Sequence, residues 1–113
     1  MQRVPSSDLR LDFEKMGGLI PVVVQDYQSR DVLMVGFMND AAWATTQSTG
    51  LVTFYSRQRQ KLWTKGETSG NVLRVRHVLV DCDEDSLVIE VEPHGPTCHT
   101  GERSCFFREV GGA

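Results

Sequence analysis

The chain has 113 residues, a net charge of −3 at pH 7 and a sequence pI near 5.5, which argues against general binding to nucleic acids. Its 40% hydrophobic and 24% charged residues fit a single globular domain, and no apolar run approaches the roughly 18 residues of a membrane span. The amino terminus has no signal-peptide core and the three cysteines form no paired framework, so we expect a cytoplasmic protein without a membrane partner.

The first predicted elements are a short helix and a β-hairpin. Residues 9–16 are typical of a short helix that leads into the fold. The β-branched run at residues 19–24 and the apolar run at residues 32–38 flank a polar turn, which favours a hairpin. Pro21 lies inside the first run and therefore belongs at a sheet edge or at a bulge.

A longer helix and a third strand follow. Asn39 or Asp40 is suited to cap a helix over residues 41–49, and Gly50 is suited to end it. Residues 51–55 predict a strand. The first half of the chain therefore predicts one main helix among several strands.

Residues 57–70 are too polar and too rich in glycine for a buried element, so we expect a loop. Cationic side chains are interleaved there with Trp63, and Ser69 and Gly70 follow. Cations, a hydroxyl group and an exposed backbone amide can hold phosphate, while an aromatic ring can stack on a base. Such a run alone is more often a solvated loop. Beside a metal site, however, it indicates a nucleotide-like substrate.

The next segment predicts a second pair of strands. Residues 71–82 alternate between apolar and polar side chains, and residues 86–92 return as the partner strand. His77 lies on the apolar face of the first strand, where a buried, hydrogen-bonded histidine is more common than a metal ligand. Residues 93–104 predict a loop, and residues 105–110 predict a short last strand.

Metal chemistry is concentrated between residues 81 and 105, which hold all three cysteines, three aspartates at alternate positions and two of the three histidines. Soft thiolates suit zinc, whereas hard carboxylates suit magnesium, calcium or manganese, so this segment can supply two different ions. The cysteine spacing, C-x15-C-x6-C, lacks the C-x2-C pairs of zinc fingers. A three-thiolate zinc site with an open position is therefore the favoured interpretation.

Other interpretations of these ligands stay open. The cysteines could be small buried hydrophobic residues, and His94 or His99 could close a structural zinc site as a fourth ligand. The aspartates and Glu92 match the ligand spacing of an EF-hand loop, but Ser86 replaces the required glycine and the flanking residues do not predict two helices. A solvated acidic turn is the simplest alternative.

Three sequence blocks occur in a distinctive order. They are SRQRQKLWTKGETSGN at residues 56–71, DCDEDSL at residues 81–87 and GPTCHTGERSCF at residues 95–106. Together with GLIPVVVQD and VLMVGFMN upstream, they resemble the phosphoribosyl-AMP cyclohydrolase family of histidine biosynthesis over residues 17–107, with residues 1–16 as an N-terminal extension. Two positions depart from the family's pattern, because Gln58 stands where serine is usual and Glu84 where glycine is common.

The resemblance implies a fold and an assembly. The expected fold is a small, strand-rich α+β domain that spans residues 1–113, has one main helix and forms an intertwined homodimer. Some members of the family carry a fused pyrophosphohydrolase domain. Because the chain ends soon after Phe107, we expect it to lack that domain.

The resemblance also implies roles for individual residues. Zinc would be bound by Cys82, Cys98 and Cys105, with Cys82 donated by the other subunit of the homodimer. Magnesium would be bound by Asp81, Asp83 and Asp85. His99 would be the catalytic acid or base, since a free imidazole has a pKa of about 6.5. The implied substrate-binding residues are Arg57, Arg59, Trp63, Lys65, Glu67 and Ser69.

The implied reaction is the hydrolytic opening of the N1–C6 bond in the adenine ring of phosphoribosyl-AMP, which yields the phosphoribosyl-formimino-AICAR-phosphate product. C6 of an N1-substituted adenine is an electrophile, and zinc would lower the pKa of bound water from about 15.7 towards 7 to supply the nucleophile. One alternative is a zinc-stabilised nucleotide- or RNA-binding module without catalysis. Another is a calcium-binding domain.

Overall fold

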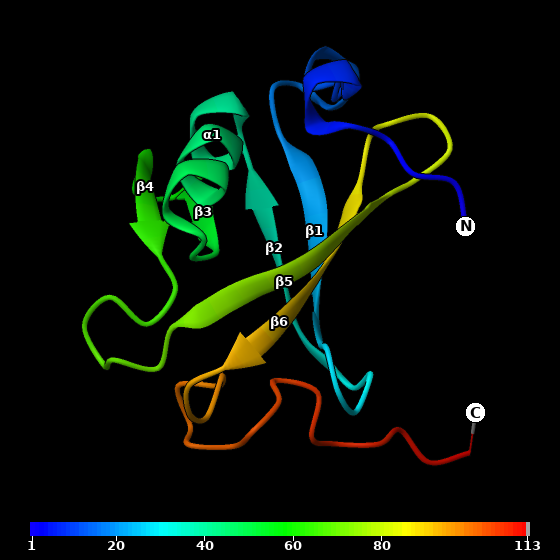
Figure 1. Ribbon diagram of the computed structural model, residues 1–113. Coiled ribbons are helices and arrows are strands. Elements are labelled where there is room, and N and C mark those ends of the chain that lie inside the picture. Colours follow the sequence, from blue (N-terminus) through cyan, green and yellow to red (C-terminus); the bar gives the residue numbers. More distant parts are fainter. Residues whose placement is uncertain (113) are drawn as a thin grey trace.

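The structure, a computed structural model, describes residues 1–112 and contains a four-stranded sheet, a two-stranded hairpin and one α-helix (Figure 1). In chain order, the elements are the 3-10 helices η1 (Ser6–Asp8) and η2 (Glu14–Met16), the strands β1 (Ile20–Asp26) and β2 (Val32–Met38), the helix α1 (Asp40–Thr49), and the strands β3 (Thr53–Ser56), β4 (Lys61–Thr64), β5 (Leu73–Val80) and β6 (Leu87–Pro93). Within the described residues, one α-helix among six strands confirms the expected small, strand-rich α+β domain.

The four strands of the sheet lie in the order β2-β1-β6-β5. β1 and β2 are antiparallel, which confirms the predicted hairpin, while β6 pairs parallel with β1 and antiparallel with β5. Pro21 lies opposite Phe37 of β2, whereas pairing of β1 with β6 begins only at Val22. Pro21 thus lies at the end of β1 where one neighbouring strand is missing, which is the edge-like position that a proline requires.

The helix α1 begins and ends as predicted. The side chain of Asn39 accepts a hydrogen bond from the N–H of Ala42 (2.8 Å), and Gly50 adopts a left-handed conformation (φ 74°) that ends the helix. The hydroxyl of buried Thr46 accepts a hydrogen bond from the N–H of Thr53 (3.0 Å), which ties α1 to β3. No helix among residues 1–112 is both long and apolar enough to cross a membrane.

The hydrophobic core lies between the sheet, α1 and β3. Its buried apolar side chains are Ile20, Val22, Val24, Leu33, Met34, Met38, Ala42, Val52, Phe54, Leu73, Leu87, Ile89 and Val91. Full burial of one large aliphatic or aromatic side chain stabilises a fold by about 1.5–3 kcal/mol, so this cluster is the main source of stability. The predicted metal ligands lie outside this cluster, in the turn after β5 and in the segment after β6.

Two expectations about secondary structure are wrong. Residues 57–70 are not a loop throughout, because β4 pairs antiparallel with β3 within this segment. The exposed edge position of β4 tolerates polar side chains, which is why the composition indicated a loop. Residues 105–110, all within the described part of the chain, form no strand. The N–H of Cys105 donates to the carbonyl of Leu33 (2.8 Å), and the chain then leaves the sheet.

His77 is not a core residue, contrary to the prediction. A shift of register between Val75 and His77 marks a bulge in β5, which is the outermost strand on its side of the sheet. The side chain of His77 is 65% exposed, and its Nδ1 lies 3.3 Å from a carboxylate oxygen of Glu90. An alternating sequence pattern does not reveal a bulge, and a shift of one residue exchanges the two faces of a strand.

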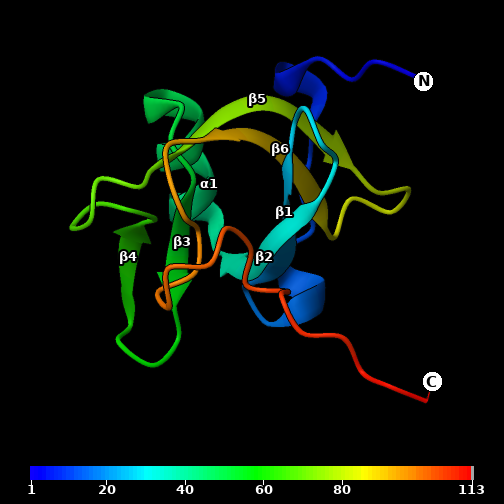
Figure 2. The same cartoon turned by 90° about the horizontal axis from the view of Figure 1, so that it is seen from below.

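The two terminal segments lie at opposite ends of the sheet. The segment before β1 runs beside the β5–β6 turn, and the segment after β6 runs past the β1–β2 turn (Figure 1). Seen from below, the C-terminal segment passes β2, where the N–H of Cys105 bonds to the carbonyl of Leu33, before it turns away (Figure 2). The acidic turn and the two C-terminal cysteines are therefore at opposite ends of β6.

Candidate metal centres and substrate cavity

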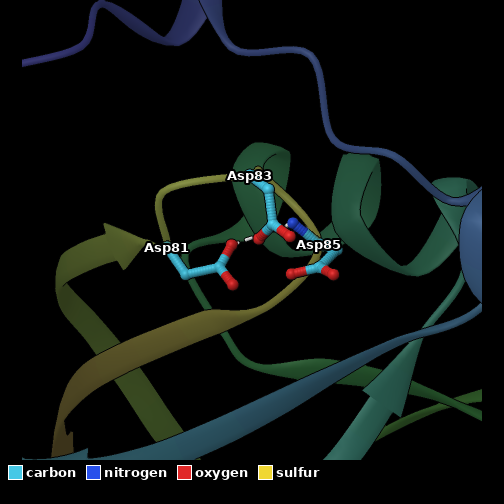
Figure 3. A group of neighbouring side chains, drawn as sticks. All are labelled: Asp81, Asp83 and Asp85. Carbon is cyan, nitrogen blue, oxygen red and sulfur yellow. Dashed lines mark hydrogen bonds between the residues drawn. The ribbon is translucent and has the colours of Figure 1, made fainter.

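The aspartate triad lies in the turn between β5 and β6. Asp81 Oδ1 accepts hydrogen bonds from the N–H groups of Asp85 (2.9 Å) and Ser86 (3.3 Å), so the turn folds back on itself and its carboxylates converge (Figure 3). One ligand oxygen from each of the three aspartates lies within 4.8 Å of the others, and residues 1–112 contain no other group of three or more such ligands. Three convergent carboxylates are the hard oxygen donors that magnesium prefers, so the residues fit the predicted ion.

The tip of this turn is tied to the N-terminal segment. Glu84 adopts a left-handed conformation (φ 60°), which explains why glycine suits this position. Its carboxylate accepts a hydrogen bond from the N–H of Arg10 (2.9 Å), and its carbonyl accepts one from the N–H of Asp12 (2.8 Å). The part of the N-terminal segment around Arg10 and Asp12 is therefore packed against the candidate metal site.

Lys15 is a residue of this site that the sequence did not reveal. Its Nζ lies 2.7 Å from Asp83 Oδ2 and 2.9 Å from Asp85 Oδ2. The hydrogen bonds to Asp83 and then to Asp85 raise the pKa of Lys15 well above its usual value. No local pattern connects a lysine with a turn 68 residues later in the chain, so only the tertiary structure identifies it.

The contacts between the carboxylates shift the pKa values of Asp81 and Asp85 in opposite directions. The hydrogen bonds from Asp85 hold the pKa of Asp81 below its usual range. The hydrogen bond from Lys15 lowers the pKa of Asp85. The neighbouring carboxylates of Asp81 and Asp83 outweigh this contact and raise that pKa above its usual value. A divalent cation must displace any proton that this group retains, so affinity for the cation is expected to fall as the pH falls.

Replacement of Lys15 by methionine is expected to increase the affinity of the triad for Mg²⁺ severalfold. The change removes a positive charge that lies within 3 Å of two of the ligand oxygens, so the divalent cation no longer competes with it. Titration calorimetry with Mg²⁺ measures the change. Arg76→Met is the matched control, because its 2.8 Å ion pair with Glu92 is similarly exposed and lies elsewhere. An unchanged or weaker affinity in Lys15→Met would contradict the competition.

Cys98 and Cys105 form a second set of potential ligands. The Thr100 hydroxyl donates a hydrogen bond to Cys98 Sγ (3.0 Å), and this contact, with the backbone of Thr100, lowers the pKa of the Cys98 thiol. Partial burial of the thiol, and then the nearby Cys98, raise the pKa of Cys105. The two thiols lie close enough for each to shift the pKa of the other. Such a pair suits a soft metal ion such as zinc.

Cys82 does not join this pair within one chain. It follows β5, at the opposite end of β6 from Cys98, and a strand of this length spans about 20 Å. Cys82 lines a groove of about 960 Å³ between the N-terminal segment, α1 and β5. One chain therefore brings together two of the three predicted thiolates, and a three-thiolate site needs a second copy of the chain.

A polar cavity of about 520 Å³ lies over the β3–β4 hairpin and the loop that follows it. It is lined by Ser56, Gln58, Arg59, Trp63, Thr64, Gly66, Glu67, Thr68, Ser69 and His99. Ligand pockets commonly measure about 300–1,000 Å³, so the cavity is large enough for a nucleotide. The structure thus brings His99, from the C-terminal loop, next to four of the six predicted substrate-binding residues.

The other two predicted substrate-binding residues lie outside the cavity lining. The guanidinium of Arg57 stacks over the ring of Phe37, 4.9 Å from its centroid. The charge of Lys65 reaches the thiol pair, where it adds to the lowering of the Cys98 pKa by Thr100 and opposes the rise that burial causes in the pKa of Cys105. Lys65 is therefore placed to act on the thiol site.

The lining of the cavity is held by the core. Trp63 packs against the buried ring of Phe54, with 5.2 Å between the ring centroids. Gly66 has a φ of 83°, and a Cβ at this position would collide with the backbone of Asn71. Only glycine fits so close a turn, so the loop after β4 returns directly towards β5. Trp63 and Gly66 of the cavity lining are thus held in place by their packing.

Fold and site together define a class: a small α+β domain that carries two separate sets of potential metal ligands and a cavity of nucleotide size. A sequence profile of the phosphoribosyl-AMP cyclohydrolase family matches residues 34–107. The chain belongs to this family.

Several curated proteins named "histidine biosynthesis bifunctional protein HisIE" are similar to the chain. The protein from Vibrio parahaemolyticus is 54% identical over 103 residues, which is 91% of this chain and 49% of that protein. The protein from Xanthomonas axonopodis pv. citri is 58% identical over 96 residues (85% and 47%), and the one from Staphylococcus aureus is 53% identical over 104 residues (92% and 49%). The chain spans about half the length of these relatives.

Proposed function

We propose that the chain hydrolyses the N1–C6 bond in the adenine ring of phosphoribosyl-AMP and so acts in histidine biosynthesis. The observation that carries this proposal is the position of His99, which lines the nucleotide-sized cavity and directly follows Cys98 in the chain. A proton-transfer group beside a metal ligand suits metal-assisted hydrolysis. Membership of the phosphoribosyl-AMP cyclohydrolase family and the similarity to histidine-biosynthesis proteins support the same reaction.

The cavity supplies groups for each part of the substrate. The indole of Trp63 offers a surface for stacking of the purine. The guanidinium of Arg59 and the hydroxyl of Ser69 can bind phosphate oxygens. These contacts would hold the ring with its C6 atom towards His99 and the thiol pair, so that the reacting groups meet in a fixed geometry.

The chemistry needs an activated water molecule and a route for its proton. Zinc bound by the thiols would lower the pKa of a water molecule from about 15.7 towards 7 and make it a nucleophile at neutral pH. His99 would accept the proton of the attacking water and return it to N1, which receives the electron pair of the broken N1–C6 bond. Cys98 and Cys105 would hold the zinc together with Cys82 of the partner subunit. The aspartate triad of the partner subunit, which adjoins that Cys82, would bind magnesium and neutralise charge near the substrate.

The exposed surface supports the homodimer that this zinc site requires. Phe106 and Phe107 directly follow Cys105, and they are 61% and 48% exposed. The groove that holds Cys82 is apolar along much of its length, with Val4, Leu9, Trp43, Val75 and Val78 in its lining. A second copy that placed its two phenylalanines in this groove would bring its thiol pair towards Cys82 and complete the three-thiolate set.

A turnover assay tests the proposal. We expect purified protein to convert phosphoribosyl-AMP with a change in purine absorbance, to stop after treatment with a zinc chelator and to resume when Zn²⁺ is returned. The test combines the substrate, the nucleophile and the metal in one measurement. Binding of phosphoribosyl-AMP without conversion would contradict the proposal and would favour a zinc-stabilised nucleotide-binding module.

A further inference from the structure

Arg103 connects the segment between Cys98 and Cys105 to the β1–β2 turn. Its Nη1 donates to Asp31 Oδ2 (2.8 Å), and its Nη2 donates to Asp26 Oδ2 (3.0 Å) and to the hydroxyl of Ser29 (2.7 Å). Three acceptors on one guanidinium fix its position, because its donors are held in one rigid plane. The side chain of Arg103 thus binds the cysteine-bearing segment to the β1–β2 turn.

Asp26 is a firm anchor for this contact. The residue is only 7% exposed, and its Oδ1 accepts hydrogen bonds from the N–H groups of Gln28 (2.8 Å) and Ser29 (3.2 Å). Burial raises the pKa of Asp26, but the hydrogen bonds from Gln28, Ser29 and Arg103 together lower it below its usual value. Asp26 is therefore a carboxylate with a fixed orientation, and Arg103 bonds to its second oxygen.

The backbone around Arg103 transmits this anchoring to both cysteines. On one side, the carbonyl of Arg103 accepts from the N–H of Thr97 (3.2 Å), and the carbonyl of Glu102 accepts from the N–H of Cys98 (3.1 Å). On the other side, the Ser104 hydroxyl donates to the carbonyl of Val32 (2.7 Å). The chain on both sides of Arg103, towards Cys98 and towards Cys105, is thus held by hydrogen bonds next to the anchored residue.

We propose that Arg103 is a positioning residue for the metal-binding thiols: by bridging Asp26 and Asp31, it holds Cys98 and Cys105 at the separation that zinc requires. This inference rests on the proposed function, because the thiol pair is taken as a zinc site. Arg103 lies among acceptors of the β1–β2 turn and does not line the substrate cavity. Its loss is therefore expected to weaken zinc binding while the chemistry of the zinc-loaded site is retained.

Zinc affinity of purified full-length protein, measured by competition with a chromophoric chelator, tests the inference. We expect Arg103→Met to weaken zinc binding by about tenfold or more, as is usual for residues that support metal ligands. At saturating Zn²⁺ its kcat is expected to return to near the wild-type value. The zinc affinity of Arg103→Lys is expected to lie between those of the wild type and Arg103→Met. One ammonium group cannot reach both carboxylates as the guanidinium does.

Arg30→Met is the matched control for a general loss of stability. Arg30 lies on the same turn and makes an ion pair of similar length with Glu90 (2.8 Å), but in the described structure it makes no hydrogen bond or ion pair with the cysteine segment. Its zinc affinity is expected to equal that of the wild type. If Arg103→Met fails to fold, Asp31→Asn removes one of the three contacts and is expected to weaken zinc binding by a smaller factor. The double variant with both Arg103→Met and Asp31→Asn is expected to have the same zinc affinity as Arg103→Met alone.

The outcomes separate this inference from the proposed function. Wild-type zinc affinity in a folded Arg103→Met variant overturns the positioning role, and so does an equal loss in Arg30→Met. A wild-type protein that binds no zinc also overturns it. A wild-type protein that binds zinc but does not convert phosphoribosyl-AMP removes the proposed function, whereas the role of Arg103 is still decided by the affinity measurements.

Discussion

Cys98→Ser is expected to remove bound zinc and to abolish turnover of phosphoribosyl-AMP. Cys98 is the buried member of the thiol pair, and the hydrogen bonds from Thr100 lower its pKa, so it is the better preformed thiolate of the two. Serine is nearly isosteric with cysteine, but its hydroxyl is not a zinc ligand of comparable strength. Metal analysis of the purified protein and a turnover assay should show both losses in the same variant.

The fold of this variant should be unaffected, because a hydroxyl can accept the hydrogen bonds that now reach the sulfur. Circular dichroism and thermal unfolding of the metal-free proteins are therefore expected to match those of the wild type. A Cys98→Ser protein with normal turnover would exclude the thiol site from the mechanism. A protein without zinc that nevertheless turned over at the normal rate would lead to the same conclusion.

His99→Ala is expected to retain zinc but to reduce kcat by about 10²-fold or more, which is the usual contribution of a general acid or base. His99 lines the substrate cavity, so the change removes a proton-transfer group from the place where the ring would bind. Its removal leaves both thiols of the pair in place. Zinc content and steady-state kinetics of the same preparation separate the two effects.

His94→Ala is the control for this variant. His94 lies in the same C-terminal loop, but its Nε2 is 3.9 Å from Glu92 and it does not line the cavity. We expect its kcat and zinc content to match the wild type. An unchanged rate in His99→Ala would remove His99 from the mechanism. A loss of zinc in His99→Ala would instead favour a structural site in which His99 is the fourth ligand.

The elements that were predicted correctly are those with local signals. Asn39 and Gly50 delimit α1 through contacts within a few residues, and two β-branched or apolar runs delimit the β1–β2 hairpin. The parallel pairing of β1 with β6 was not predicted, because it joins segments about sixty residues apart in the chain and parallel strands have no turn to mark them. The bulge that exposes His77 also has no local signal.

The candidate site shows the same division. The family resemblance implied that Asp81, Asp83 and Asp85 act together, and the structure brings one ligand oxygen of each within 4.8 Å of the others. The role of Lys15 depends on how the N-terminal segment packs, and that of Arg103 depends on a turn more than seventy residues earlier. Residues that hold a site in place are distant in sequence, so the residue types of the site do not identify them.

The β5–β6 turn has one further consequence. Asp81 and Cys82 are consecutive residues, yet they belong to the carboxylate set and to the thiolate set respectively. If both ions bind as proposed, a displacement of the turn by one ion moves a donor atom of the other. Their binding equilibria are then linked, and reciprocity requires that each ion change the affinity for the other by the same factor. Because Cys82 would serve the partner's zinc, this linkage would couple the magnesium of one protomer to the zinc held by its neighbour.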